Sequence, residues 1–255
     1  MLGIGVFGAS GRVGKLIVDI AQESSDIKLE SVYARKELDF SISPGVLITS
    51  DLKVFLESCE VIIDFTTPQG TKQLLEAALL YPKPIVIGTT GLEFHHENLI
   101  KEASKKMPIF YASNMSLGIA VLNRAIAMVA NALKDFDIEI VETHHRHKKD
   151  SPSGTALSLA KTCAVARGLE LDEVRISGRN GNIGERTQKE IGVMSLRGGD
   201  VVGKHNVGFY GDGEYLELIH TATSRLTFAK GSIKAALWLK NQPSGFYSIE
   251  DFLNF

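Results

Sequence analysis

The sequence predicts an α/β protein with a doubly wound parallel sheet, together with a second α+β domain whose sheet is mixed or antiparallel. Short β-branched runs alternate with helical patterns as far as about Ser113, which is typical of parallel βαβ units. Glycines follow the first predicted strand directly and lead into a helix. From about Ser116 the pattern changes to a long helix and then to strands joined by glycine-rich turns. We therefore expect two domains.

The first part of the chain consists of short apolar strands and amphipathic helices. Strands are predicted at 4–9, 29–34, 61–66, 84–90 and 108–113, and helices at 14–24, 71–81 and 93–106. Turn residues stand at the carboxyl ends of these strands, namely Gly8, Thr66–Pro68, Gly88–Gly91 and Asn114. In open α/β sheets the ligand crevice lies at these ends, so we expect a binding site there.

The second part mixes helices and strands. A helix is predicted at 116–134, a strand at 137–145 and a helix at 153–168. A glycine- and charge-rich segment at 177–186 is expected to be mobile. Strands that we expect to be antiparallel follow at 191–197, 205–211 and 214–223, and a final helix at 229–241.

The composition excludes several classes of protein. The 255 residues are 44% hydrophobic and 23% charged with a net charge of -2, which provides no basic field for nucleic acid. The two cysteines, Cys59 and Cys163, lie in apolar surroundings and are expected to be inert, and so few cysteines fit a reducing compartment. No apolar run approaches the roughly 20 residues of a membrane span. The prediction is a soluble cytoplasmic protein without membrane or nucleic-acid partners.

A glycine-rich turn follows the first strand. In "IGVFGASGRVGKL", Gly8, Gly11 and Gly14 form a G-x-x-G-x-x-G pattern between strand and helix. Glycines there allow a tight turn and let backbone N–H groups approach a pyrophosphate at the helix N-terminus. The pattern favours a Rossmann-type dinucleotide site, although a tight turn without a ligand has the same signature.

The tip of the second strand bears on the choice of dinucleotide. NAD enzymes usually place a carboxylate there, but this chain has Ala34, Arg35 and Lys36. Guanidinium and ammonium groups suit the 2′-phosphate of NADP, so the sequence favours NADPH over NADH. A solvated basic loop, with Glu37 turning inward, is the alternative.

The run "ETHHRHKKDSPSGTA", from Glu142 to Ala156, crowds histidines and cations beside a turn. On an extended strand His145 and His147 would share a face, as a zinc pair does. The neighbouring Arg146, Lys148 and Lys149 would repel a dication, so no metal site is predicted. Nucleic acid is disfavoured because no aromatic residues interleave the cations.

The same run fits an organic anion. Ser153 is a candidate N-cap, after which Gly154 and Thr155 would present backbone N–H groups at a helix start. Lys148 would complete such a site, and a histidine could deliver a proton to the bound molecule. A basic strand end exposed to water remains the alternative.

Taken together, several motifs resemble those of 4-hydroxy-tetrahydrodipicolinate reductases, also called dihydrodipicolinate reductases. They are the glycine loop, "VIIDFT", "IGTTG", "ASNMSLGI", "HHRHKKDSPSGTA" and "RGGDVVGKHNVGFYGDGEYLELIHTATSR", which cover essentially the whole chain. The resemblance implies reduction of a cyclic, unsaturated dicarboxylate by NADH or NADPH in diaminopimelate and lysine biosynthesis. Hydride would go to ring carbon C4 and a proton to C3, with loss of water.

The resemblance also implies roles for individual residues. His144 matches the family's proton donor, and Lys148 matches the lysine that stabilises negative charge and binds a carboxylate. Substrate-binding positions are His145, Gly154 and Thr155. Cofactor-binding positions are Gly8, Ala9, Ser10, Gly11, Arg12, Val13, Gly88, Thr89, Thr90, Ala112, Ser113, Asn114 and Met115, to which Arg35 is added from the strand tip.

Family members are usually homotetramers joined through the sheet of the second domain, and their chain returns to the first domain at its end. This implies a dinucleotide-binding domain of residues 1–115 completed by 228–255, and a substrate-binding and oligomerisation domain of residues 116–227. Members that use both cofactors often have an acid and then an arginine at the second strand tip. The Ala34–Arg35 pair departs from that pattern and argues against strong use of NADH.

Several interpretations stay open. Another two-domain reductase, such as a semialdehyde or homoserine dehydrogenase, and a redox-sensing regulator that binds NADPH are the alternatives. We expect His144 and Lys148 to converge only if the chain bends over 149–154. Arg197 and Asp200 are expected to form a buried ion pair, and His95 and His96 to be exposed on a helix. The sequence does not decide the roles of His205, His220 and Arg225.

Overall fold

The computed structural model describes residues 1–254, so Phe255, the last residue of the predicted first domain, lies outside the described residues. The chain divides into two compact units. Unit 1 contains residues 1–117 and the chain from Arg225 onward, and unit 2 contains residues 118–224.

The centre of unit 1 is a parallel sheet of seven strands within the described residues, in the order β12-β6-β5-β4-β1-β2-β3. The strands are β1 (Leu2–Phe7), β2 (Ile27–Tyr33), β3 (Leu47–Thr49), β4 (Val61–Asp64), β5 (Ile85–Ile87), β6 (Pro108–Tyr111) and β12 (Gly245–Tyr247). The strand order reverses between β1 and β4, where doubly wound sheets open their ligand crevice.

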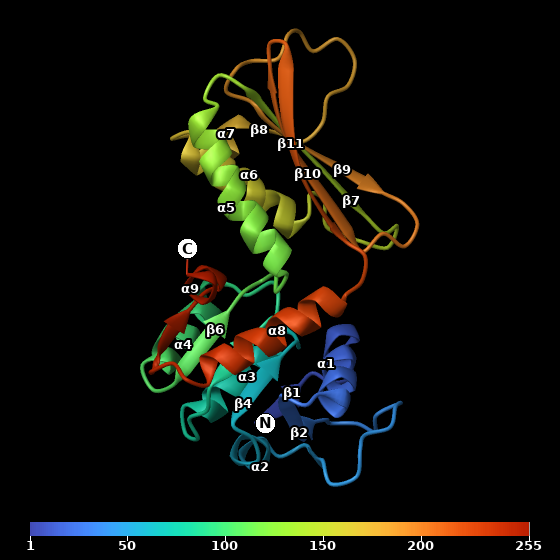
Figure 1. Ribbon diagram of the computed structural model, residues 1–255, viewed down its shortest axis with the longest axis vertical. Helices are drawn as coiled ribbons and strands as arrows, with labels where there is room; N and C mark the ends of the chain where they lie inside the picture. The colour runs from blue at the N-terminus through green and yellow to red at the C-terminus, as the bar shows by residue number, and fades with distance from the viewer. Residues whose placement is uncertain (255) are drawn as a thin grey trace. The chain divides into compact units, whose positions relative to one another are not determined.

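Helices cover both faces of this sheet. They are α1 (Arg12–Glu23), α2 (Leu52–Glu57), α3 (Pro68–Ala78), α4 (Phe94–Ser104), α8 (Leu226–Leu239) and α9 (Ile249–Leu253). Residues of α1 and α8 pack in one apolar core, and residues of α2, α3 and α4 pack in the other. Figure 1 shows α8, in orange-red, running across the sheet near α1, in blue. The predicted Rossmann-type fold class is confirmed.

Local sequence explains where several of these helices begin. Thr67 caps α3 by accepting from the Gly70 amide at 3.3 Å, and Pro68 occupies the first helical position, where a missing N–H costs nothing. Ser248 and Asp251 form a reciprocal capping box at α9. The sequence patterns missed the short elements β3, α2, β12 and α9. Such elements carry too few residues for a clear period, and β3 and β12 form because they pair with the edges of the sheet.

Unit 2 contains a five-stranded mixed sheet in the order β11-β10-β7-β9-β8, with helices packed on one face. Its elements are α5 (Leu117–Ala132), β7 (Asp137–His144), α6 (Gly154–Ala166), α7 (Leu171–Val174), β8 (Arg175–Ile176), β9 (Ile191–Arg197), β10 (Gly203–Gly211) and β11 (Glu214–Ala222). The antiparallel prediction holds for β10 and β11. It is wrong for β9, which pairs in parallel with β7 and β8.

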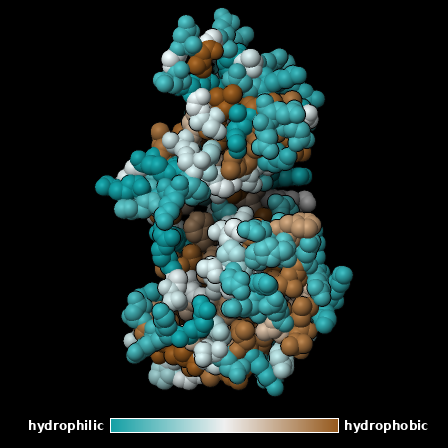
Figure 2. Space-filling model, turned by 180° about the vertical axis from the view of Figure 1, so that it is seen from behind, coloured by the Kyte–Doolittle hydropathy of each residue, from teal (hydrophilic) through white to brown (hydrophobic). Residues whose placement is uncertain are grey.

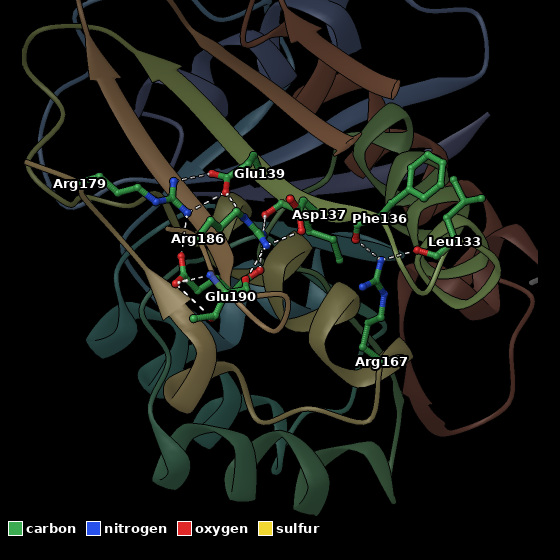
Figure 3. A network of polar contacts seen from close by, with 10 residues as sticks. Leu133, Phe136, Asp137, Glu139, Arg167, Arg179, Arg186 and Glu190 are labelled. Atoms are coloured by element: carbon green, nitrogen blue, oxygen red, sulfur yellow. Dashed lines mark hydrogen bonds and ion pairs between the residues drawn. The ribbon is translucent and has the colours of Figure 1, made fainter. Parts of the chain in front are cut away.

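The other face of this sheet carries a polar network that fastens the 177–190 segment. Arg186 donates to Asp137 at 2.6 Å and to Glu139 at 3.0 Å, and Arg179 bridges Glu139 and Glu190. Figure 3 shows both guanidinium groups pointing toward Glu139 on β7. The segment expected to be mobile therefore has two anchors on the sheet, although it forms neither helix nor strand over 177–186.

Hydrophilic side chains dominate the face drawn in Figure 2, with apolar ones scattered among them. Across the described residues, no helix has the length and apolar character required to cross a membrane.

Candidate active site

The connection between β1 and α1 in unit 1 requires glycine at two positions, Gly8 and Gly14. Gly8 has φ +99°, and a Cβ there would lie 2.5 Å from the Phe65 carbonyl oxygen after β4. A Cβ on Gly14 would lie 2.1 Å from the Gly8 carbonyl oxygen, so the helix starts directly against the loop. The Gly11 amide donates to that same oxygen at 2.9 Å. This close packing brings the start of α1 to the crevice, as dinucleotide phosphates require.

A cavity of about 540 Å³ opens beside this loop. Its walls come from the loop after β1, the tip of β2 and the loop after β4. Of the predicted cofactor residues, it is lined by Gly8, Ser10, Gly11 and Arg35. Lys36 also lines it, so two cations lie where a ribose phosphate would bind. These residues fit a dinucleotide.

The other predicted cofactor residues lie around the same edge of the sheet. Ala9 is a buried residue of the glycine loop, and Arg12 and Val13 are the first residues of α1. Gly88–Thr90 follow β5 and Ala112–Met115 follow β6, each at the carboxyl end of its strand. They extend the crevice along the sheet without lining the 540 Å³ cavity.

A buried carboxylate that sequence reasoning did not single out ties two of these loops together. Asp64, at the end of β4, is fully buried and accepts from the hydroxyls of Thr66 at 2.6 Å and Thr71 at 2.5 Å. The Thr66 amide donates both to Asp64 and to the Thr89 hydroxyl, each at 3.0 Å. Burial raises the pKa of Asp64 to about 6, although the threonine bonds oppose this shift. The signal in the sequence was a lone acid in an apolar strand.

In unit 2 the histidine run begins on β7 and then leaves it. The strand ends at His144, and the chain turns at Arg146–His147 with the Lys148 amide donating to the His145 carbonyl at 3.1 Å. The chain therefore turns first at 146–147 and bends again at 150–152, within the predicted 149–154. His145 and His147 consequently do not share a strand face. Among the described residues, no group of three histidine, cysteine, aspartate or glutamate side chains is placed to hold a metal ion.

The loop after β7 leads to Ser153, the predicted N-cap of the next helix. The Ser153 hydroxyl accepts from the Ala156 amide at 3.2 Å and so caps α6, which begins at Gly154. Thr155 lies in the first turn of this helix, where backbone N–H groups and the helix dipole favour an anion. The ammonium group of Lys148 lies 2.9 Å from the Asp150 carboxylate, and the Lys148 side chain is 20% exposed.

His144 is held by a buried carboxylate. Its Nδ1 lies 2.6 Å from Oε2 of Glu142, whose side chain is inaccessible to solvent. Arg197 donates to both carboxylate oxygens of Glu142 at 2.8 Å. Burial alone would raise the pKa of Glu142, but the bonds from Arg197 and His144 outweigh it and lower the pKa to about 2. Glu142 therefore remains ionised at neutral pH.

Three further histidines need comment. His205 is buried with its ring 5.2 Å from that of His144, and its Nε2 lies 3.2 Å from the Ser153 hydroxyl. Burial, and then the neighbouring His144, lower the pKa of His205 to about 4, so it is neutral at physiological pH. The prediction that His96 is exposed is wrong: it is 4% exposed because its ring accepts from the Glu93 amide in a helix cap. His95 is exposed as expected.

The expected ion pair between Arg197 and Asp200 is also wrong. Arg197 turns to Glu142 on the adjacent strand and donates to the Asp150 carbonyl at 2.7 Å, while Asp200 is exposed. The parallel pairing of β9 with β7 places Arg197 opposite His144, which the sequence did not reveal. The two thiols meet expectation, since burial raises the pKa of Cys59 to about 11 and of Cys163 to about 12.

A dinucleotide-binding unit joined to a unit with a potential proton donor is the organisation of a two-domain oxidoreductase. Family models described as the N-terminus and the C-terminus of dihydrodipicolinate reductase match residues 2–115 and 118–253. The chain belongs to the dihydrodipicolinate reductase family. It is an oxidoreductase that reduces 4-hydroxy-tetrahydrodipicolinate with a nicotinamide cofactor in diaminopimelate and lysine biosynthesis.

Similar proteins agree with this assignment. The 4-hydroxy-tetrahydrodipicolinate reductase of Wolinella succinogenes is 66% identical over 251 residues, 98% of each chain. That of Sulfurimonas denitrificans is 60% identical over 253 residues, 99% of each chain. The dipicolinate-bound dihydrodipicolinate reductase from Paenisporosarcina sp. TG-14 has the same fold, with a TM-score of 0.80, 22% identity and 98% of each chain covered. The expected family is confirmed, and neither alternative enzyme class nor a non-catalytic regulator is supported.

Proposed function

We propose that the acid chemistry of this reduction belongs to the segment from His144 to Thr155. The observation that carries the proposal is the course of this segment, from a carboxylate-held imidazole through a tight turn to a capped helix start. When bound, the nicotinamide supplies hydride to ring carbon C4 of the substrate. His144 delivers the proton to C3, and Lys148 offsets the negative charge that develops.

Recognition of the dicarboxylate falls to the neighbouring residues. Lys148 offers an ammonium group that is already oriented by Asp150, and Gly154 and Thr155 lie at the positive end of α6. His145 follows the proton donor directly and completes the set. Two carboxylates held in this way fix the ring, and such positioning contributes a large part of catalysis.

Cofactor binding falls to the predicted glycine loop and the strand ends of unit 1. We infer that residues 1–115 and 228–255 form the dinucleotide-binding domain and residues 116–227 the substrate-binding domain. NADPH is favoured over NADH because Arg35 and Lys36 line the cavity beside the glycine loop. Glu37 lines the same cavity, which is the feature that favours some use of NADH.

A homotetramer assembled through the outer face of the unit 2 sheet is also part of the proposal. Apolar side chains are exposed on that face, where monomers usually present polar ones: Leu196, Tyr210, Tyr215 and Ile219. Light scattering should then give four times the 27.8 kDa chain mass, and a single chain mass would contradict it. A cytoplasmic location fits the two unpaired buried cysteines.

The test is a coupled assay in which dihydrodipicolinate synthase supplies the substrate and the loss of reduced cofactor is followed by absorbance. His144→Ala should lower kcat by about 10²–10⁴-fold, the range for a lost general acid, with cofactor affinity unchanged. Wild-type turnover in this variant would remove His144 from the donor role. Glu170→Gln, at an exposed ion pair with Lys161 in the same unit, is the matched control and should keep wild-type kcat.

A further inference from the structure

Glu142 stands two residues before His144 on β7, so both side chains point to the same face of the sheet. Oε2 of Glu142 lies 2.6 Å from Nδ1 of His144, a short contact typical of an ionised acceptor. The Glu142 side chain is inaccessible to solvent, and that of His144 is 11% exposed. A buried carboxylate therefore contacts one particular nitrogen of the imidazole, Nδ1.

Glu142 is fixed by groups from two other parts of unit 2, the start of α6 and β9. Its Oε1 accepts from the Ser153 amide at 3.0 Å and from Arg197 at 2.8 Å, and its Oε2 accepts from Arg197 at 2.8 Å. Arg197 is held in turn by the carbonyls of Leu196 and Asp150, each at 2.7 Å. The two-pronged pairing defines the plane of the carboxylate as well as its position.

This arrangement decides where the hydrogen of a neutral His144 resides. An ionised carboxylate has no hydrogen to donate, so the nitrogen facing it must carry one. Nδ1 is therefore the protonated nitrogen in the neutral ring, and Nε2 is the nitrogen that gains or loses a proton. A Cβ added at Gly203 would lie only 3.0 Å from Nε2, so a glycine there keeps space beside this atom.

We propose that Glu142 is a positioning residue for the proton donor, holding the His144 ring with Nδ1–H toward itself so that the proton leaves from Nε2. The inference rests on the proposed donor role of His144. In the step, the Nε2–H bond of the imidazolium breaks and its electron pair stays on Nε2. The proton joins the substrate carbon and forms the new C–H bond with that carbon's electron pair. The ring ends neutral with Nδ1–H, Glu142 stays ionised, and water returns a proton to Nε2.

The wild-type full-length protein gives the first test. Nitrogen-15 NMR of the imidazole side chains reports which ring nitrogen carries the hydrogen when the His144 ring is neutral. The His144 signals are assigned by their absence in His144→Ala. The expected result is the Nδ1–H tautomer. An Nε2–H tautomer would overturn the inference, and this measurement needs no variant of Glu142 to fold.

The second test is Glu142→Gln, which keeps the shape of the side chain but lets an amide N–H face Nδ1. We expect kcat to fall by about 10²-fold, as for lost outer-shell partners of a histidine, while substrate KM and cofactor affinity change by less than about threefold. The His144 signals should shift toward the Nε2–H tautomer. Glu170→Gln, at the exposed ion pair with Lys161, should alter none of these quantities.

The outcomes separate this inference from the proposed function. If His144→Ala lowers turnover and Glu142→Gln retains wild-type kcat, only the positioning role fails. A loss of kcat in Glu142→Gln with an unchanged tautomer would show a structural role and would also overturn it. If both variants turn over as wild type does, the donor role of His144 fails and the inference fails with it.

Discussion

Two fully buried carboxylates, one in each unit, have pKa values shifted in opposite directions. Asp64 of unit 1 accepts only neutral donors, from threonine hydroxyls and an amide, and burial raises its pKa to about 6. Burial also acts to raise the pKa of Glu142 in unit 2, but hydrogen bonds from Arg197 and His144 outweigh it and lower the pKa to about 2. Burial costs an ionised acid several kcal/mol unless a charged partner offsets it. The difference between the two acids therefore lies in their partners.

The two acids also serve different parts of the protein. Asp64 links the loops after β4 and β5, and both loops lie at the edge where the cofactor is expected. Glu142 links β7, β9 and the start of α6 around the proposed proton donor. Neutral donors around a carboxylate are sufficient to shape the loops of unit 1, whereas the proposed proton donor of unit 2 is held by a carboxylate with a charged partner.

Removal of Arg197 should have the largest effect on stability. Arg197→Met leaves Glu142 buried without its guanidinium, and breaking such a pair costs about 3–5 kcal/mol in the free energy of unfolding. Urea unfolding at neutral pH measures the loss. Arg179→Met is the control, since its 28% exposed ion pairs should contribute about 1 kcal/mol or less. Equal losses in the two variants would mean that burial does not distinguish these pairs.

Replacement of Asp64 should remove a pH dependence. Because the pKa of Asp64 is about 6 in the folded protein against 3.8 ordinarily, its contribution to stability is lost as the pH rises from about 4 to about 6. Across that window the free energy of unfolding of the wild type should fall relative to Asp64→Asn by roughly 3 kcal/mol. Urea unfolding at about pH 4 and about pH 7 measures both proteins. A constant difference between them would contradict the raised pKa.

Glu142 should give a pH dependence of stability with the opposite sign. Its lowered pKa makes a contribution to stability that is complete above about pH 4.5 and is lost as the pH falls toward about 2. The pH ranges in which Asp64 and Glu142 change stability therefore lie on opposite sides of about pH 4. Acid unfolding curves of Asp64→Asn and Glu142→Gln should accordingly diverge from that of the wild type in different pH ranges.

Arg35→Ala should weaken NADPH binding by about tenfold to a hundredfold, the value of one or more lost charge-assisted bonds to a phosphate. NADH lacks the 2′-phosphate and serves as the control, with a change of less than about twofold. Fluorescence titration of both cofactors measures the ratio. An equal loss of affinity for both cofactors would place Arg35 away from the 2′-phosphate.

The smallest effects should come from the two helix caps. Ser153→Ala and Thr67→Ala each remove a capping oxygen and should each cost about 1 kcal/mol of stability. Steady-state kinetics should separate them, because Ser153 caps the proposed substrate helix and Thr67 lines the cofactor cavity. The substrate KM should rise only in the first variant and the cofactor KM only in the second.

Much of the fold could be predicted because its signals are local. Apolar strands alternating with amphipathic helices, the glycine loop and the Ser153 cap depend on residues within a few positions of one another. The bend after His144 was foreseen, but the turn at 146–147 was not, because pairing with β10 through Thr143 and with β9 through His144 decides where β7 ends.

The sequence by itself determined the family, the two kinds of sheet and the identity of the histidine–lysine run. Only the tertiary structure decided the partners of the charged groups. Arg197 could have paired with the nearby Asp200, but the parallel register of β9 on β7 brings it to Glu142, 55 residues away. A charge pairs with whatever the fold buries beside it, and distance along the chain carries no information about that choice.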